Sequence, residues 1–99
     1  MNTEIINKIT KYFANRPVVK AWLFGSYSRG EETPESDVDI LVVFDPVADI
    51  SLLEHVGMQL ELEEILGKDV DLVTDGTFYP WVVQAVNKDK ILIYERKTA

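Results

Sequence analysis

The sequence contains no cysteine and no excess of basic residues, and both absences narrow its function. Without a thiol, the 99-residue chain forms no disulfide, no zinc–thiolate site and no cysteine nucleophile. Seventeen acidic and ten basic residues give a net charge of −7. Proteins that bind a nucleic-acid backbone are usually basic, because phosphate neutralisation supplies much of their affinity. We therefore expect no polynucleotide template, whereas a small nucleotide held through a metal ion, or a basic protein partner, is compatible with this charge.

Long apolar runs are also absent. No stretch approaches the roughly 20 residues needed to span a membrane, and Met1–Phe13 lacks the apolar core of a signal peptide. We expect a cytoplasmic protein that does not associate with membranes. Hydrophobic residues make up 46% of the chain and charged residues 27%, which is typical of a globular protein. The length predicts one domain that spans residues 1–99.

Hydrophobic patterning predicts helices that alternate with strands. Apolar residues recur at helical spacing in four segments and form β-branched or alternating runs in four others. The first expected helix is capped by Asn2 or Thr3 and is stopped by Arg16-Pro17, and its buried face consists of Ile5, Ile9, Tyr12 and Phe13. The other expected helices cover residues 26–31, 51–66 and 77–87, of which the second begins with a capping box at Ser51–Glu54 and is followed by Gly67 as its C′ residue. The expected strands cover residues 18–24, 38–44, 69–73 and 91–94. The order αβαβαβαβ predicts an α/β (α+β) fold, in which helices pack on a small sheet.

The third expected helix combines an apolar stripe with a run of acidic residues. We expect the stripe to be its buried face, and its members are Leu53, Val56, Leu60 and then Ile65 or Leu66. The carboxylates of this region are Asp49, Glu54, Glu61, Glu63 and Glu64. No lysine or arginine precedes Lys68 in this helix. This charge favours a solvated face over a docking face for a basic partner.

The segment Trp22–Phe44 contains the residues with the clearest chemistry. An apolar run ends at Gly25-Ser26, and the next apolar run begins at Ser36–Ile40, which contains Asp37 and Asp39. Two residues apart on a strand, these aspartates share a face, with Cα atoms about 6.5 Å apart. Carboxylates are ligands that Mg²⁺ prefers, and a Gly-Ser turn offers backbone N–H groups and a hydroxyl to a phosphate. Together they indicate phosphoryl or nucleotidyl transfer.

A third carboxylate, Asp71, lies in the short apolar segment Val70–Val73. A charge there is costly unless it is paired or bound to metal. Asp69 is the rival candidate, two residues earlier on the same face. We prefer Asp71, because apolar residues on both sides imply deeper burial. Three carboxylates could hold two metal ions that clamp the attacking and leaving oxygens, and Asp71 could accept a proton from an attacking hydroxyl.

Competing motifs fail at individual positions. Gly25–Gly30 has the glycine spacing of a P-loop, but Glu31-Glu32 stand where lysine and serine or threonine are required. A calcium loop that begins at Asp37 would place Leu41 and Ala48 at ligand positions. His55 has no partner at ligand spacing, so we expect a surface or boundary histidine.

Taken together, Gly25-Ser26-x-x-Arg29-Gly30, Ser36-Asp37-x-Asp39-Ile40 and Val70-Asp71-Leu72 resemble the minimal nucleotidyltransferase signature of the polymerase-β superfamily. More narrowly, they resemble the MNT-type antitoxins that are encoded beside HEPN-type ribonuclease toxins. The resemblance covers nearly the whole chain. It implies a mixed sheet with three aspartates on one side, and transfer of AMP from ATP to a hydroxyl with release of pyrophosphate.

The resemblance also implies a partner and residue roles. In the toxin–antitoxin pairs the acceptor is a tyrosine of the HEPN-type toxin, which could form an oligomer with the antitoxin. Asp37 and Asp39 would bind two Mg²⁺ ions, and Asp71 would bind the catalytic ion and help to activate the acceptor. The Gly-Ser turn would hold the triphosphate. The implied metal and catalytic residues are Asp37, Asp39 and Asp71, and the implied nucleotide-binding residues are Gly25, Ser26 and Arg29. Arg29 either contacts the nucleotide or braces the loop.

Two other functions remain open from the sequence. One is a non-catalytic antitoxin that silences its partner by occlusion, with or without a nucleotide. The other is a small-molecule nucleotidyltransferase, for which dimerisation would have to supply the acceptor-binding surface.

Overall fold

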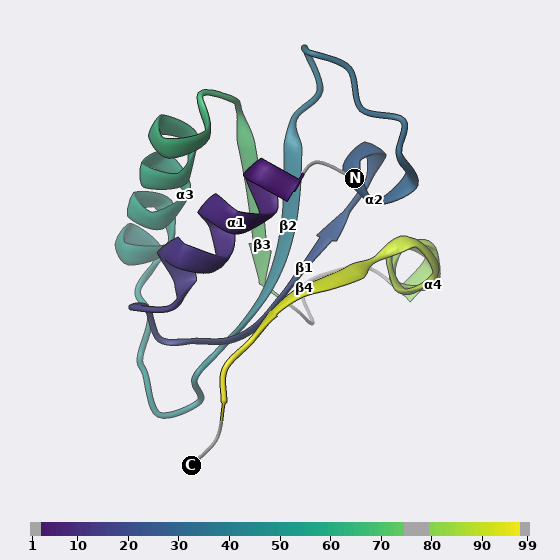
Figure 1. Ribbon diagram of the computed structural model, residues 1–99. Helices are drawn as coiled ribbons and strands as arrows, with labels where there is room; N and C mark the ends of the chain where they lie inside the picture. Colours follow the sequence, from purple (N-terminus) through teal and green to yellow (C-terminus); the bar gives the residue numbers. More distant parts are fainter. Residues whose placement is uncertain (1–2, 75–79, 98–99) are drawn as a thin grey trace.

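The computed structural model describes residues 3–74 and 80–97, and the elements follow the predicted alternating order (Figure 1). The helices are α1 (Thr3–Phe13), α2 (Ser26–Arg29), α3 (Leu52–Leu66) and α4 (Pro80–Asp89), and the strands are β1 (Val18–Phe24), β2 (Val38–Phe44), β3 (Val70–Thr74) and β4 (Ile91–Glu95). The predicted start of the fourth helix at Thr77 lies outside the described residues. None of the described helices is long and apolar enough to cross a bilayer.

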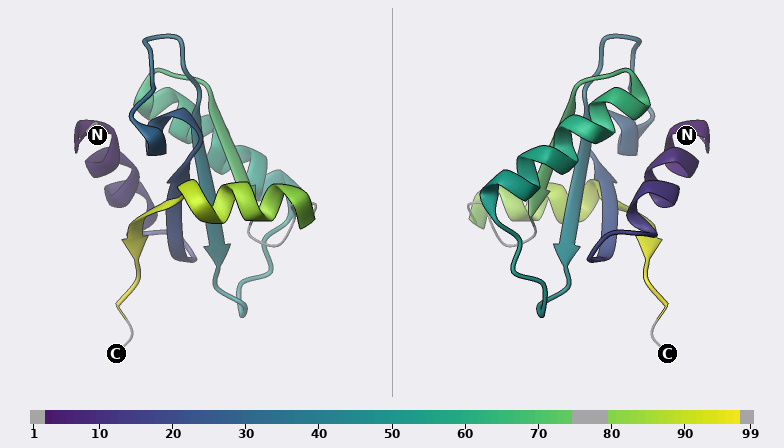
Figure 2. Two further views of the ribbon diagram at one scale, coloured as in Figure 1. Left: turned by 90° about the vertical axis from the view of Figure 1, so that its right-hand side faces the viewer. Right: turned by 90° about the vertical axis from the view of Figure 1, so that its left-hand side faces the viewer.

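The strands form one mixed sheet in the order β3-β2-β1-β4. Strand β1 pairs antiparallel with both β2 and β4, whereas β2 and β3 are parallel. Helices α1 and α3 lie on one face of the sheet and α4 on the other (Figure 2). The interior of β2 is covered on both faces, since Ile40, Leu41 and Val42 are all buried. The predicted α/β class and the mixed sheet are confirmed.

Helix α1 packs through the face that its sequence pattern predicts. Ile5, Ile9, Tyr12 and Phe13 follow helical spacing, and all four are buried. Each fully buried aliphatic or aromatic side chain of this kind contributes about 1.5–3 kcal/mol to folding. This single amphipathic face therefore fixes α1 on the sheet.

Helix α3 is delimited by caps at both ends. The Ser51 Oγ accepts a hydrogen bond of 3.1 Å from the backbone N–H of Glu54, and the Ser51 hydroxyl donates to Glu54 Oε1 at 3.2 Å. Gly67 follows the last turn with a φ of +65°, a left-handed conformation that glycine adopts at little cost. These local interactions are readable from the sequence, and the helix begins and ends where they predict.

Polar side chains of α3 close the outer edge of β3. His55 Nε2 donates to the carbonyl oxygen of Leu72 at 2.6 Å. The backbone N–H of Leu72 donates to Gln59 Oε1 at 3.2 Å, and that of Val70 donates to Glu63 Oε2 at 3.0 Å. The helix rises about 6 Å from Gln59 to Glu63, and the strand spans about 6.6 Å from Leu72 to Val70, so these two contacts follow the same spacing. The helix thereby satisfies backbone groups that a sheet edge would otherwise leave open.

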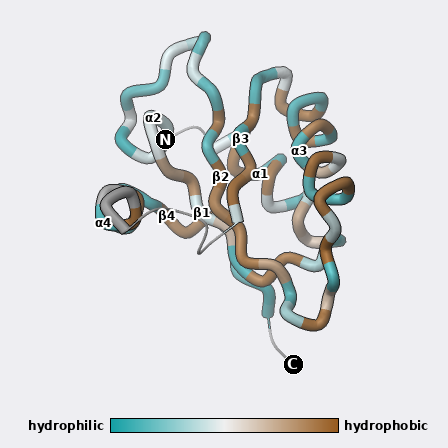
Figure 3. Tube along the Cα trace, turned by 180° about the vertical axis from the view of Figure 1, so that it is seen from behind, coloured by the Kyte–Doolittle hydropathy of each residue, from teal (hydrophilic) through white to brown (hydrophobic). Residues whose placement is uncertain are grey.

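This arrangement contradicts the predicted orientation of α3. The buried side chains are Met58, Leu62 and Leu66, and the exposed ones are Leu53, Val56, Leu60 and Ile65. The prediction of a buried stripe through Leu53, Val56 and Leu60 was wrong. Figure 3 shows hydrophobic residues distributed along α3 rather than confined to one side. Because two sides of the helix are apolar, periodicity alone could not identify the side that faces the core.

Candidate active site

The strand register brings two of the predicted aspartates together. In the parallel pair, Asp39 of β2 lies opposite Asp71 of β3. In the antiparallel pair, Asp39 lies opposite Phe24, the last residue of β1, and Gly25 follows directly. The end of β1 and the beginnings of β2 and β3 therefore meet at one end of the sheet. Motifs that are far apart in the sequence form a single site there.

The burial expected for Asp71 is wrong, although its place beside Asp39 supports the assignment. Asp71 is exposed, while its neighbours Val70 and Leu72 are buried. Successive strand side chains point to opposite faces, so apolar neighbours in sequence say little about the face that Asp71 occupies. Asp69 is exposed as well and precedes β3. Register, rather than burial, distinguishes Asp71 from Asp69.

The electrostatics of Asp39 reflect a concentration of negative charge. Burial, followed by the charges of Asp71 and Asp37, raises the pKa of Asp39 from 3.8 to about 6, and Arg29 opposes this rise. Asp37 is exposed and lies just before β2. A half-buried carboxylate beside two others, with too little positive charge to balance them, is an environment that a divalent cation would stabilise.

The donor set fits Mg²⁺ in its chemistry. It consists only of carboxylate oxygens, which this ion prefers, and a magnesium site needs few of them because waters and substrate phosphates supply the remaining ligands. Among residues 3–74 and 80–97, no three His, Asp or Glu side chains are arranged as a complete metal site. The aspartates thus mark the place where a cation fits, but their side chains do not form a complete coordination shell.

Gly25 is required by the close approach of the turn to Asp39. Its φ of +69° lies in the left-handed region. A Cβ at this position would lie 3.2 Å from the carboxyl carbon of Asp39 and would also collide with its Oδ2. The Gly25 carbonyl oxygen accepts hydrogen bonds from the Ser28 hydroxyl at 2.7 Å and from the Ser28 backbone N–H at 3.1 Å. A bare backbone is therefore held against the carboxylate group.

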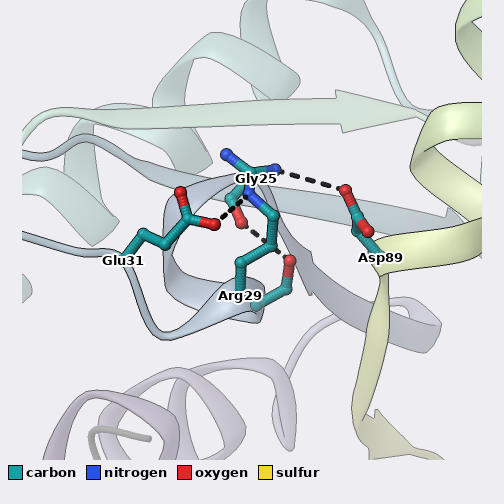
Figure 4. Close-up of polar contacts among 5 residues, drawn as sticks. Gly25, Arg29, Glu31 and Asp89 are labelled. Carbon is teal, nitrogen blue, oxygen red and sulfur yellow. Dashed lines mark hydrogen bonds and ion pairs between the residues drawn. The ribbon is translucent and has the colours of Figure 1, made fainter.

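Arg29 links the α2 turn to the end of α4 (Figure 4). Its Nε lies 3.2 Å from Glu31 Oε1, and its Nη1 lies 3.3 Å from Asp89 Oδ2. Of the two roles expected for Arg29, this contact corresponds to bracing the loop, and contact with a nucleotide stays a prediction. Sequence reasoning missed Asp89, because 60 residues separate it from Arg29 and no local pattern connects them.

The fold and the site define a nucleotidyltransferase. The chain belongs to the nucleotidyltransferase domain family, whose pattern matches residues 5–97. A Methanocaldococcus jannaschii protein assigned to the protein adenylyltransferases is 41% identical over 92 residues, which cover 91% of this chain and 92% of that protein. The protein adenylyltransferase MntA of Thermococcus cleftensis is 38% identical over 71 residues, which cover 72% of this chain and 70% of MntA.

Solved structures give the same result. A toxin–antitoxin structure with AMP-PNP contains a chain with a TM-score of 0.77 and 26% identity, covering 93% of this chain and 74% of that one. A protein assigned as a minimal nucleotidyltransferase has a TM-score of 0.72 and 32% identity, covering 87% of this chain and 86% of that one. The resemblance inferred from the sequence motifs is confirmed at the level of family, fold and enzyme class. The roles of the individual site residues stay predictions.

Proposed function

We propose that this nucleotidyltransferase is an antitoxin. In a Mg²⁺-dependent reaction it transfers AMP from ATP to the hydroxyl group of a tyrosine in a HEPN-type toxin. The observation that carries the proposal is the pairing of Asp39 with Asp71 directly beside the Gly25 turn. Two relatives support the choice of donor and partner. MntA of Thermococcus cleftensis is a protein adenylyltransferase, and the similar toxin–antitoxin structure was determined with AMP-PNP, an ATP analogue.

In the proposed mechanism, Asp37, Asp39 and Asp71 would hold two Mg²⁺ ions. When bound, Mg²⁺ would supply positive charge that stabilises the phosphate oxygens and lowers the pKa of the attacking hydroxyl. Asp71 is exposed, so an acceptor side chain can reach it. Its carboxylate receives the proton of the acceptor hydroxyl. The acceptor oxygen forms a bond to the α-phosphorus, and the bond from that phosphorus to the pyrophosphate oxygen breaks.

The Gly25 turn supplies the second half of the mechanism. The backbone there lies against Asp39 with no side chain between them. Backbone N–H groups and the Ser26 hydroxyl at such a turn can hold the triphosphate next to the carboxylates. Positioning the α-phosphorus close to the acceptor lowers the entropic part of the barrier.

We further propose that residues 1–99 act as one domain, and that the reaction takes place in the cytoplasm.

The test is an intact-mass measurement of the partner. The chain is co-expressed with the product of its adjacent gene, either unchanged, as Asp39→Asn, or as Asp69→Asn. The Asp69 variant is the matched control, because it removes an exposed carboxylate that precedes β3. We expect the partner to gain whole AMP units with the unchanged chain and the control, and none with Asp39→Asn. An unmodified partner beside the unchanged chain, with ATP and Mg²⁺ present, would refute catalysis.

A second function, silencing by occlusion, requires only a surface that binds the partner, and one candidate surface is exposed. Leu53, Val56 and Leu60 are exposed on the outside of α3, where an apolar surface suits binding to another protein. A transfer-dead Asp39→Asn chain that still neutralised the partner would establish this function.

A further inference from the structure

The outer side of α3 presents an apolar strip that no described residue covers. The strip consists of Leu53, Val56 and Leu60, which are 83%, 41% and 57% exposed. Their spacing of three and four residues places them on one face of the helix. Leu52, 80% exposed, lies beside the strip at its N-terminal end. The strip therefore runs along the helix for two turns.

The strip plays no part in holding α3 to the sheet. That task belongs to other sides of the helix, through buried Leu62 and its apolar neighbours and through the polar contacts to the β3 edge, such as Gln59 to Leu72. A surface helix normally carries polar residues on the side that faces water. Exposed leucines arranged in a row are characteristic of surfaces that bind another protein.

The charge around the strip indicates the chemistry of the partner. No lysine or arginine occurs between Arg29 and Lys68 in the sequence, and Arg16 lies against α3 through its ion pair of 3.4 Å with Glu61. Exposed Glu64 lies one turn after Leu60, and exposed Glu54 is adjacent to Leu53. A second copy of this chain, with its own net charge of −7, would bring like charges together at the same patch. A partner with lysine or arginine around an apolar patch would instead be attracted.

We propose that the α3 strip, with Glu54 and Glu64 at its border, is the docking surface for a partner protein whose apolar patch is bordered by basic residues. The inference rests on the proposed function in taking the toxin as that partner. A ribonuclease must neutralise RNA phosphates and therefore presents a basic surface. The strip occupies the first half of α3, and the C-terminal end of α3 lies at the same end of the molecule as the beginnings of β2 and β3 (Figure 1). A partner that docks along the length of α3 therefore reaches the end of the sheet that carries the aspartates.

The test measures the dissociation constant of the complex with the adjacent-gene product for three variants. Leu60→Lys places a charge within the strip, and lysine is as good a helix former as leucine. Glu64→Lys reverses a charge at its border. Leu92→Lys is the matched control, because Leu92 is 48% exposed and lies on β4, at the opposite edge of the sheet.

We expect Leu60→Lys to weaken the complex at least about tenfold. Glu64→Lys should weaken it less, because this variant associates more slowly, and high salt should remove the difference in association rate from the unchanged chain. Leu92→Lys should bind like the unchanged chain. Unchanged affinity in both α3 variants would overturn the proposal, as would a loss confined to Leu92→Lys or the absence of any complex. Sedimentation that showed self-association through the strip would overturn the choice of partner in favour of a second copy.

Intact mass of the partner, taken from the same mixtures, separates this inference from the proposed function. A complex that depends on Leu60 and contains no AMP on the partner would refute the transfer reaction and leave the docking surface standing. Normal AMP transfer and normal binding by Leu60→Lys would refute the docking surface and leave the transfer reaction standing.

Discussion

Replacing Asp39 with asparagine should stabilise the protein while it abolishes AMP transfer. Burial and the charges of Asp71 and Asp37 raise the pKa of Asp39 from 3.8 to about 6. Each pKa unit corresponds to about 1.4 kcal/mol, so the shift amounts to about 3 kcal/mol at full value. Because the side chain is only partly buried, solvent screening reduces this to about 1–2 kcal/mol. The asparagine side chain would keep a similar shape and carry no charge.

The sign of the pH dependence follows from the raised pKa. The folded state holds a proton on Asp39 up to a pH of about 6, whereas the unfolded chain releases it near 3.8. The charged carboxylate therefore costs stability in full above pH 6, and this cost disappears as the pH falls toward 4. The stability gained by Asp39→Asn should be largest at pH 7 and above, and should shrink as the pH approaches 4.

Denaturant unfolding at pH 7.5 and pH 4.5, with EDTA present, measures this difference. Asp69→Asn is the control, because this exposed carboxylate should leave the free energy of unfolding within about 0.5 kcal/mol of the unchanged chain. An Asp39→Asn chain that was less stable than the unchanged chain at pH 7.5, or equally more stable at both pH values, would refute the reasoning.

Three further outcomes are expected. Saturating Mg²⁺ should raise the melting temperature of the unchanged chain and not that of Asp39→Asn, as scanning calorimetry would show; equal shifts would contradict a site at Asp39. Gly25→Ala should lower the free energy of unfolding by about 2 kcal/mol and abolish nucleotide binding. Gly30→Ala is the control, because Gly30 also has a positive φ, +71°, but nothing lies within 4 Å of an added Cβ; it should lower the free energy of unfolding by about 1 kcal/mol and retain nucleotide binding. Leu62→Ala should cost about 2–5 kcal/mol in denaturant unfolding and Leu60→Ala less than about 1 kcal/mol; the reverse order would mean that α3 is turned the other way.

Local signals account for the parts of the fold that sequence reasoning predicted well. The face of α1, the caps of α3 and the limits of β2 each depend on residues within a few positions of one another. The aspartate pair Asp37 and Asp39 and the Gly25 turn likewise lie within 15 residues in the sequence. Motifs of this kind are readable because the chemistry and the backbone geometry that they require are local.

The orientation of α3 could not be predicted for a specific reason. Both sides of the helix carry apolar residues. One side has Leu53, Val56 and Leu60, and the opposite side has Met58, Leu62 and Leu66. Burial of either side would satisfy the hydrophobic effect. The choice is made by His55, Gln59 and Glu63, whose hydrogen bonds to β3 exist only once the strand lies beside the helix. Polar side chains that decide an orientation carry no periodic signal of their own.

By itself, the sequence determined the alternating order of helices and strands, and it supplied the candidates for the chemistry, three aspartates and a glycine turn. Only the tertiary structure decided that Asp39 lies opposite Asp71, that Asp71 is exposed, and that Arg29 pairs with Asp89. These contacts join residues 32 and 60 positions apart, as the differences 71 − 39 and 89 − 29 show. Register and long-range ion pairs depend on how whole elements dock, and docking minimises the free energy of the entire core rather than that of any local segment.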